Sequence, residues 1–197
     1  MKATSEPLPI QILDTTVFMG GLVLPLYYVS DTQVNAQVPF EIDPNATYQL
    51  LVTRGNTISL PVGVDVAPAQ PAVFRDTSVA PNQGVILVVR GKEQFEATPS
   101  SPASEGDVIV MFCAGLGAVN PVIAAGAQGN GQPTTITPTV TIGGINTTVK
   151  FSGLTPGFVG LYQINAIVPK GVPSGNTVPV TINIAGQTSP PVIMAIQ

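Results

Sequence analysis

The chain has 197 residues, of which 44% are apolar and only 9% charged, with 20 glycines, 20 prolines, one cysteine and no histidine. A chain this apolar can bury a core, which argues against intrinsic disorder. The missing histidine excludes a Ser-His-Asp triad, a Cys-His pair and histidine metal ligands. The net charge of −4 offers no electrostatic footprint for nucleic acid.

Short β-branched and aromatic runs alternate with Gly, Pro, Asn and Asp at intervals of about ten residues, which is typical of β-sandwiches. No long window has the apolar spacing of a helix. The sequence therefore predicts an all-β protein with little helix. The predicted strands are Ile10–Leu13, Val17–Met19, Leu24–Val29, Gln33–Val38, Tyr48–Arg54, Ile58–Val66, Val85–Arg90, Val108–Cys113, Thr139–Ile142, Thr147–Phe151, Leu161–Val168, Val178–Ile184 and Val192–Ile196.

Two local patterns refine these strands. Pro179 lies inside an alternating run and has no N–H for a ladder, so this strand is expected at a sheet edge or a bulge. Residues 84–97 predict a hairpin that turns at Gly91 and Lys92.

The chain repeats itself at a separation of 130 residues. Gln33–Pro39 (QVNAQVP) returns as Gln163–Pro169 (QINAIVP), and the similarity continues through the strands that follow. We therefore expect two tandem immunoglobulin-like β-sandwich domains. The expected boundaries are 1–69 for the first sandwich, 70–103 for a connecting hairpin and loop, and 104–197 for the second sandwich. In the repeated motif, Asn35 and Asn165 are expected to bond neighbouring backbone, and contact with a ligand is the alternative.

The first domain is expected to lack its opening strand. The strand and turn at Gly106–Gly117 precede the second copy of the repeat, and their counterpart in the first copy would lie before Met1. An open strand edge needs a cover. Three covers are considered: the segment Ala72–Ala97, edge pairing with a second copy of the chain, and an upstream segment.

Several blocks resemble an uncharacterised C-terminal domain family of large exported proteins from Solibacter-type acidobacteria. They are Leu26–Ser30 (LYYVS), Gly115–Pro121 (GLGAVNP) and Gly153–Asn165 (GLTPGFVGLYQIN), together with the repeat motif. The resemblance implies immunoglobulin-like sandwiches akin to the IPT/TIG group, at the C-terminal end of secreted or cell-surface proteins. It implies no reaction and no cofactor, because the family has no assigned activity.

Few residues are candidates for chemistry. Glu41, Asp43 and Asn45 place three oxygen-bearing side chains on alternate residues, a weak calcium pattern; a solvated loop is the alternative. Asp14 and Asp76 each begin a motif similar to that of aspartic proteases but lack its glycine, so turn aspartates are the preferred interpretation.

Other residues favour structural roles. Cys113 lies in an apolar strand and is expected to be a buried thiol. Tyr162 is expected to pack at a sandwich corner with its hydroxyl bonded to backbone, and a sugar-stacking platform with Phe158 is the alternative.

These observations favour a non-catalytic structural or adhesion module at the cell surface or outside the cell. The alternative is a polysaccharide-binding accessory module of a secreted protein. The partner is expected to be an unknown surface protein or a glycan, and not nucleic acid. Membrane insertion is not expected, because no run is long and apolar enough to span a bilayer. No apolar segment suited to a signal peptide occurs near Met1. An enzyme would need two carboxylates facing each other in a cleft.

Overall fold

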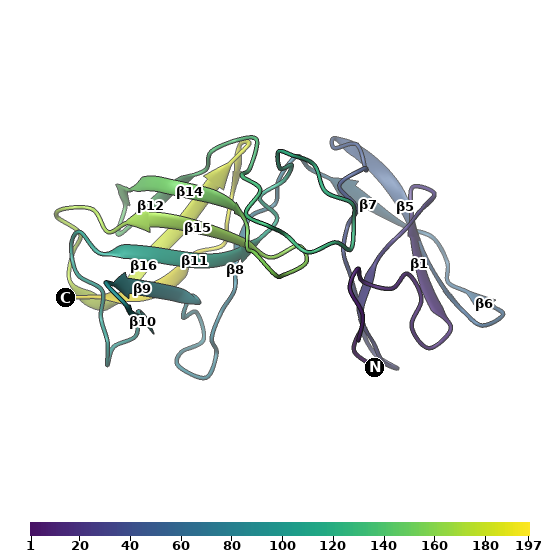
Figure 1. Cartoon of the computed structure of the whole chain (residues 1–197), viewed down its shortest axis with the longest axis horizontal. Coiled ribbons are helices and arrows are strands. Elements are labelled where there is room, and N and C mark those ends of the chain that lie inside the picture. Colours follow the sequence, from purple (N-terminus) through teal and green to yellow (C-terminus); the bar gives the residue numbers. More distant parts are fainter. The chain divides into compact units, whose positions relative to one another are not determined.

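The computed structural model describes residues 1–197 and consists of 18 β-strands in four antiparallel sheets (Figure 1). It contains no helix, and so none that could cross a membrane. The chain divides into two compact units. Unit 1 comprises Met1–Pro68, Pro121–Asn130 and Pro156–Gly160; unit 2 comprises Ala69–Asn120, Gly131–Thr155 and Leu161–Gln197.

Unit 1 contains a five-stranded sheet and a separate two-stranded sheet. The larger sheet has the order β2-β1-β5-β6, with β7 also paired to β5, and the smaller one joins β3 to β4. The strands are β1 (Thr15–Met19), β2 (Leu22–Val23), β3 (Leu26–Val29), β4 (Val34–Ala36), β5 (Ala46–Arg54), β6 (Thr57–Ile58) and β7 (Val62–Val66).

Unit 2 contains a six-stranded and a five-stranded sheet. The first has the order β10-β9-β11-β15-β14, with β8 paired to β11; the second has the order β13-β12-β16-β17, with β18 paired to β16. The strands are β8 (Ala72–Val73), β9 (Ile86–Arg90), β10 (Glu93–Glu96), β11 (Val108–Ala114), β12 (Thr139–Ile142), β13 (Ile145–Asn146), β14 (Thr148–Leu154), β15 (Tyr162–Ile167), β16 (Gly175–Ile184), β17 (Gln187–Thr188) and β18 (Val192–Ile196).

The two five-stranded sheets share strand order and register. In unit 1, Leu50 of β5 lies opposite Met19 of β1 and Val62 of β7. In unit 2, Val180 of β16 lies opposite Ile142 of β12 and Val192 of β18. Strands β5, β6 and β7 therefore correspond to β16, β17 and β18 at the 130-residue separation seen in the sequence.

The remaining sheets differ in extent. The repeated motif forms β4 in unit 1 and β15 in unit 2. In unit 2, β15 lies between β14 and β11, and the yellow strand β16 of the second sheet passes behind these green strands (Figure 1). In unit 1, β4 pairs with β3 alone. Unit 2 is thus a two-layered sandwich, whereas one layer of unit 1 has only two strands.

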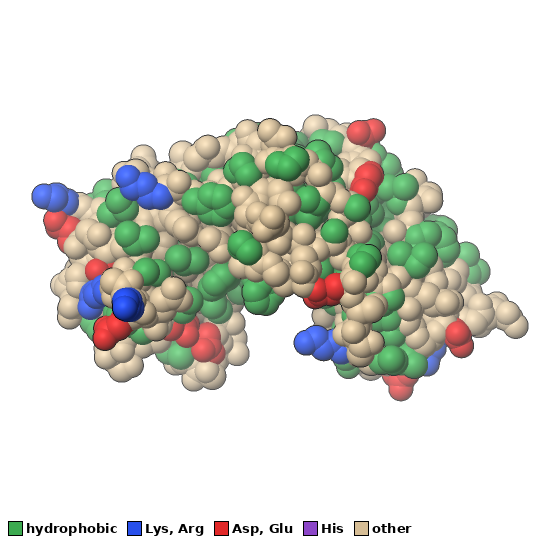
Figure 2. Space-filling view, in the orientation of Figure 1, with side chains coloured by type: hydrophobic (Ala, Val, Ile, Leu, Met, Phe, Trp, Pro, Cys, Tyr) green, Lys and Arg blue, Asp and Glu red, His purple; other side chains and the backbone are tan.

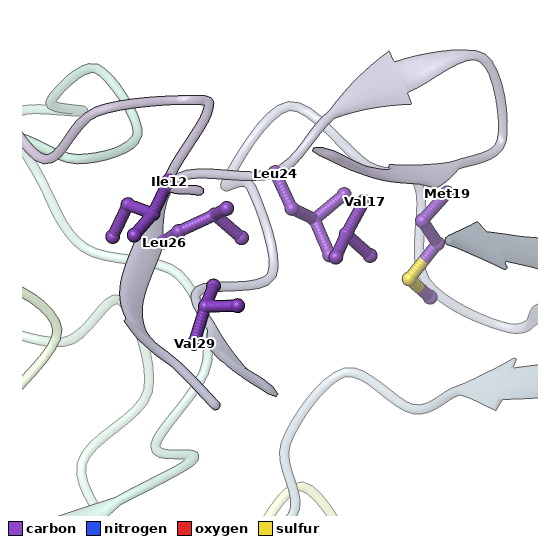
Figure 3. Packing of buried hydrophobic residues seen from close by; sticks show 6 residues of the cluster. All are labelled: Ile12, Val17, Met19, Leu24, Leu26 and Val29. Carbon is purple, nitrogen blue, oxygen red and sulfur yellow. The ribbon is translucent and has the colours of Figure 1, made fainter. Parts of the chain in front are cut away.

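A small apolar cluster forms the core of unit 1. Alternate residues of β1 point inward, so that Val17 and Met19 are buried, and Val17 packs close to Leu24 (Figure 3). The cluster consists of Ile12, Val17, Met19, Leu24, Leu26 and Val29.

Most predicted strands are present, and β12 and β18 have the expected bounds. The hairpin that turns after Arg90 is also confirmed, as β9 and β10. Ile10–Leu13 is not a strand: Ile12 makes only a bridge to Thr15, and Leu13 has a positive φ of 48°. The strand was predicted because apolar and polar side chains alternate in this segment, but the segment has no neighbouring strand to pair with.

Pro179 was expected at an edge or a bulge. Strand β16 lies between β12 and β18 and is not an edge strand, and the structure has the bulge instead. The pairing between β12 and β16 ends at Val180, one residue before the missing N–H would be needed. The carbonyl of Pro179 still accepts a hydrogen bond from the N–H of Gly143 at 2.8 Å. A register shift between Gly175 and Val178 lies beside the proline, in agreement with the expected bulge.

Residues 70–103, expected as a connection, lie in unit 2 and supply β8, β9 and β10. Both β8 and β9 pair with β11. The segment Ala72–Ala97 was one of the three covers considered for the first domain. Its strands β8 and β9 instead complete the sheet of unit 2.

Two loops distant in sequence join unit 1 instead. The buried side chain of Gln37 accepts a hydrogen bond from the N–H of Gly126 at 2.6 Å. The carbonyl of Gly126 accepts one from the N–H of Leu8 at 2.9 Å, and the hydroxyl of Tyr27 donates to the carbonyl of Val159. These bonds attach Pro121–Asn130 and Pro156–Gly160 to unit 1.

Replacing Gln37 should loosen the first of these loops. In Gln37→Ala the buried N–H of Gly126 loses its acceptor, which costs about 1–3 kcal/mol. We expect hydrogen exchange of the Gly126 amide, followed by NMR, to become at least about tenfold faster. Gln33→Ala, at an exposed position on the same strand segment, is the control and should leave that rate unchanged. An unaltered exchange rate of the Gly126 amide in Gln37→Ala would contradict a role of the Gln37 side chain in holding this loop.

Candidate functional site

The free side of β4 is the first feature that distinguishes unit 1. The N–H of Gln37 donates to Pro25, and the carbonyl of Gln33 accepts from Ser30, so these two residues bond toward β3. Strand hydrogen bonds alternate in direction along an antiparallel pair. The backbone groups of Val34 and Ala36, between them, therefore point away from β3, where β4 has no partner strand.

The apolar face beside this edge is the second feature. Nine apolar residues pack against the core of unit 1 but are only partly buried, and we call six of them, on β4, β5 and β7, the open face. They are Val34, Ala36, Leu50, Val52, Val64 and Val66. Their counterparts 130 residues later are 0 to 5% exposed: Ile164, Ala166, Val180, Ile182, Met194 and Ile196.

Two pairs of identical residues make the contrast sharper. Val38 is 49% exposed and its counterpart Val168 is 1% exposed; Val62 is 57% exposed and its counterpart Val192 is 1% exposed. The same side chain at the same place in the repeat is thus covered in unit 2 and exposed in unit 1.

On the outer side of the motif, each copy carries the same polar pair. The amide of Gln33 donates to Asn35 at 2.6 Å, and that of Gln163 donates to Asn165 at 3.2 Å. The expectation that Asn35 bonds neighbouring backbone is corrected by this contact, since side chains two apart on a strand lie on the same face.

The weak calcium candidates lie in the turn that leads into β5. Glu41, Asp43 and Asn45 are all exposed, and the N–H of Asn45 donates to Val66 at 2.6 Å. The carbonyl of Asp43 accepts from the hydroxyl of Tyr48 at 3.0 Å. The structure contains no group of three or more His, Cys, Asp or Glu side chains that could hold a metal ion.

The two aspartates of the protease-like motifs belong to different units, Asp14 to unit 1 and Asp76 to unit 2. Asp76 instead lies next to Glu96, a pairing that sequence spacing did not reveal. Hydrogen bonds from Ser78 hold the pKa of Asp76 below its usual value, whereas burial and the neighbouring Asp76 raise the pKa of Glu96.

Asp107 organises a second polar cluster. Its carboxylate accepts hydrogen bonds from Arg90 Nε at 2.9 Å and Nη2 at 2.5 Å, and from the N–H of Ser104 at 2.7 Å. These bonds, led by that of Arg90, lower the pKa of Asp107. The guanidinium of Arg90 also lies 5.2 Å from the ring centre of Phe95. The cluster ties β9 and β10 to the start of β11.

Asp107→Asn should destabilise unit 2 by about 2 kcal/mol at pH 7, the size expected for hydrogen bonds to a charged group. Because the pKa of Asp107 is lowered on folding, its contribution is present above the unfolded value of about 3.9 and lost as pH falls through the folded value. Urea unfolding followed by NMR signals of unit 2 should therefore show a mutant deficit at pH 7 that disappears at acidic pH.

The matched control for this variant is Glu105→Gln. Glu105 lies 3.9 Å from Lys170, and both side chains are largely exposed, at 52% and 92%. An ion pair of this kind contributes less than about 1 kcal/mol. A deficit of equal size in the two variants would contradict the special role of Asp107.

The structure confirms two structural expectations in unit 2. Cys113 is a buried free thiol whose pKa burial raises to about 12. Tyr162 is 5% exposed, and its hydroxyl donates to the carbonyl of Gly117. Tyr162 therefore offers no stacking surface to a sugar, whereas Phe158 is 55% exposed.

Two surface hollows belong to unit 2. One hollow, of about 260 Å³, is lined by Gly143 and residues of the segment 173–179. Another, of about 200 Å³, is lined by Arg90, Phe95, Ser101, Pro102 and Gln197. Neither lining includes a carboxylate side chain. Figure 2 shows charged side chains scattered singly or in small groups, without a broad patch of one sign on this face.

Comparison with known proteins found no matching protein-family model, no matching curated protein and no matching solved structure.

Proposed function

We propose that this protein is a non-catalytic structural or adhesion module of an exported bacterial protein, built from immunoglobulin-like sandwich repeats. One observation carries the proposal: the two units use the same five-stranded sheet in the same register. Repetition of one sheet along a chain provides length and surface for contact with partners. The resemblance to the acidobacterial family supports a location at the cell surface or outside the cell.

The use of the polar groups also supports this proposal. The carboxylate of Asp107 is occupied by Arg90 and Ser104, and that of Asp76 by the hydroxyl and N–H of Ser78. Such bonds hold loops and strands in place. Exposed apolar side chains on unit 1, rather than a cluster of titratable groups, are the surface available for binding.

Labelling of intact cells tests the location and the role together. An antibody against this chain should stain intact, unpermeabilised source cells, and protease treatment of those cells should remove the signal. Staining only after permeabilisation would contradict an exported module.

Two binding and activity assays separate the rival functions. A polysaccharide-binding module would be retained by insoluble polysaccharide, and the exposed ring of Phe158 is the side chain to test with Phe158→Ala. A carboxylate enzyme would hydrolyse a substrate in a glycosidase screen and lose that activity in Glu96→Gln, with Glu93→Gln as an exposed control. We expect neither retention nor hydrolysis.

A further inference from the structure

We propose that unit 1 is a strand acceptor: β4 and the open face take up an extended polypeptide segment from outside these 197 residues. The segment runs antiparallel to β4 and presents uncharged aliphatic side chains at alternate positions. This inference is independent of the proposed function, because it rests on the comparison of the two units within one chain.

Unit 2 shows which kind of strand would occupy the free edge of β4. Strand β15, the counterpart of β4, pairs along its whole length with β11. Met111 of β11 lies opposite Ile164, and Ile109 lies opposite Ala166, which are the counterparts of Val34 and Ala36. The carbonyl of Asp107 also accepts a hydrogen bond from the N–H of Val168, the counterpart of Val38. The edge that is free on β4 is thus the edge that carries a strand on β15.

The same strand covers the apolar face in unit 2. Alternate residues of β11 and β9 point into the sandwich and are 0% exposed: Ile86, Val88, Ile109, Met111 and Cys113. These inward side chains of β9 and β11 belong to unit 2, and in the same unit the counterparts of the open face are buried. Burial of such a face is favourable by about 25 cal/mol for each Å² of apolar area removed from water.

Strand β4 itself carries none of the usual protection of an exposed edge, and the nearest proline, Pro39, lies beyond its end. Natural edge strands are protected by charged side chains, especially lysine, or by proline. The segment 33–38 (QVNAQV) has neither, and its neighbours on the open face are also uncharged. β11 from Val108 to Ala114 is equally uncharged, so no ion is desolvated when a strand of this kind binds. Addition of a strand to a free edge is an established mode of peptide recognition.

The chain itself supplies a probe for the experiment. A synthetic peptide of residues 106–117, with Cys113→Ser and three lysines appended for solubility, is titrated into the intact protein. Hydrogen exchange of the Val34 and Ala36 amides is followed by NMR, and affinity is measured by anisotropy of a labelled peptide. We expect exchange at both amides to slow at least about tenfold at saturation. A peptide with Met111→Asp should bind at least about tenfold more weakly, because its charge would face the open face.

Two protein variants complete the test. Val38→Lys places a charge beside the free edge at a position that is already 49% exposed, so it should fold normally and weaken peptide binding at least about tenfold. Ile58→Lys, at a 66% exposed residue outside the open face, should bind as the parent protein does.

Three results would overturn the proposal. They are no binding of the peptide, protection of amides outside the segment 33–38 without protection of those of Val34 and Ala36, and equal binding by Val38→Lys and the parent protein. Sedimentation of the protein without peptide tests the other possible occupant, a second copy of this chain. If dimerisation alone protects the two amides, the face is an interface between copies of this chain and the proposed segment is rejected.

Discussion

Val168→Asp should unfold unit 2, with a loss of about 4 kcal/mol or more, because a carboxylate would replace an apolar side chain that is 1% exposed. Val38→Asp should cost less than about 1 kcal/mol, since that valine is 49% exposed. Both substitutions replace the same residue at the same place in the repeat. The difference between the two losses of stability therefore reports whether a second layer covers the valine, and not an effect of the local sequence.

Urea unfolding followed by methyl NMR signals of each unit measures both variants. Signals of each unit are needed because two units can unfold in separate transitions. Equal losses in the two variants would mean that Val38 is covered in solution, for instance by a second copy of the chain, and would contradict the exposed open face.

Gly115→Ala should also destabilise unit 2, by about 3 kcal/mol or more, because steric overlap adds to an unfavourable backbone angle. Gly115 has a φ of +74°, and a Cβ placed there would lie 1.9 Å from the carbonyl oxygen of Gln70. The backbone cannot move away easily, since the N–H of Gln70 donates to the carbonyl of Gly115 at 2.8 Å.

Gly91→Ala is the matched control for this prediction. Gly91 has a similar φ of +62°, but a Cβ there meets no atom within 4 Å. The backbone angle alone should cost about 1 kcal/mol. Thermal unfolding of the two variants, measured by circular dichroism, separates the two contributions. Equal shifts in melting temperature would show that the contact with Gln70 relaxes without cost.

The open face has a physical consequence for the stability of unit 1. In unit 2 the counterparts of its six residues are fully buried between two layers, whereas in unit 1 they lose only part of their contact with water. The loops Pro121–Asn130 and Pro156–Gly160 belong to unit 1, so residues 1–69 by themselves omit part of it. From both observations we expect that those residues by themselves do not fold as an independent, stable monomer.

The sequence by itself predicted the β class and most strands, because side-chain alternation is a property of neighbouring residues. It placed β12 and β18 correctly, and the 130-residue separation of the motif recurs in the corresponding strands β5 and β16. It also indicated the buried position of Cys113, which lies in an apolar run, and that of Tyr162, which was expected to pack at a sandwich corner.

Only the tertiary structure decided which segments meet. The pairing of Asp76 with Glu96, the hydrogen bond from Gly126 to Gln37, and the pairing of β8 and β9 with β11 join residues that no local pattern connects. Alternation says which side of a strand is apolar, but it does not say which strand lies beside it. The free edge of β4 became visible when the partners of β15 were known, because a missing neighbour is a property of the sheet and not of the strand.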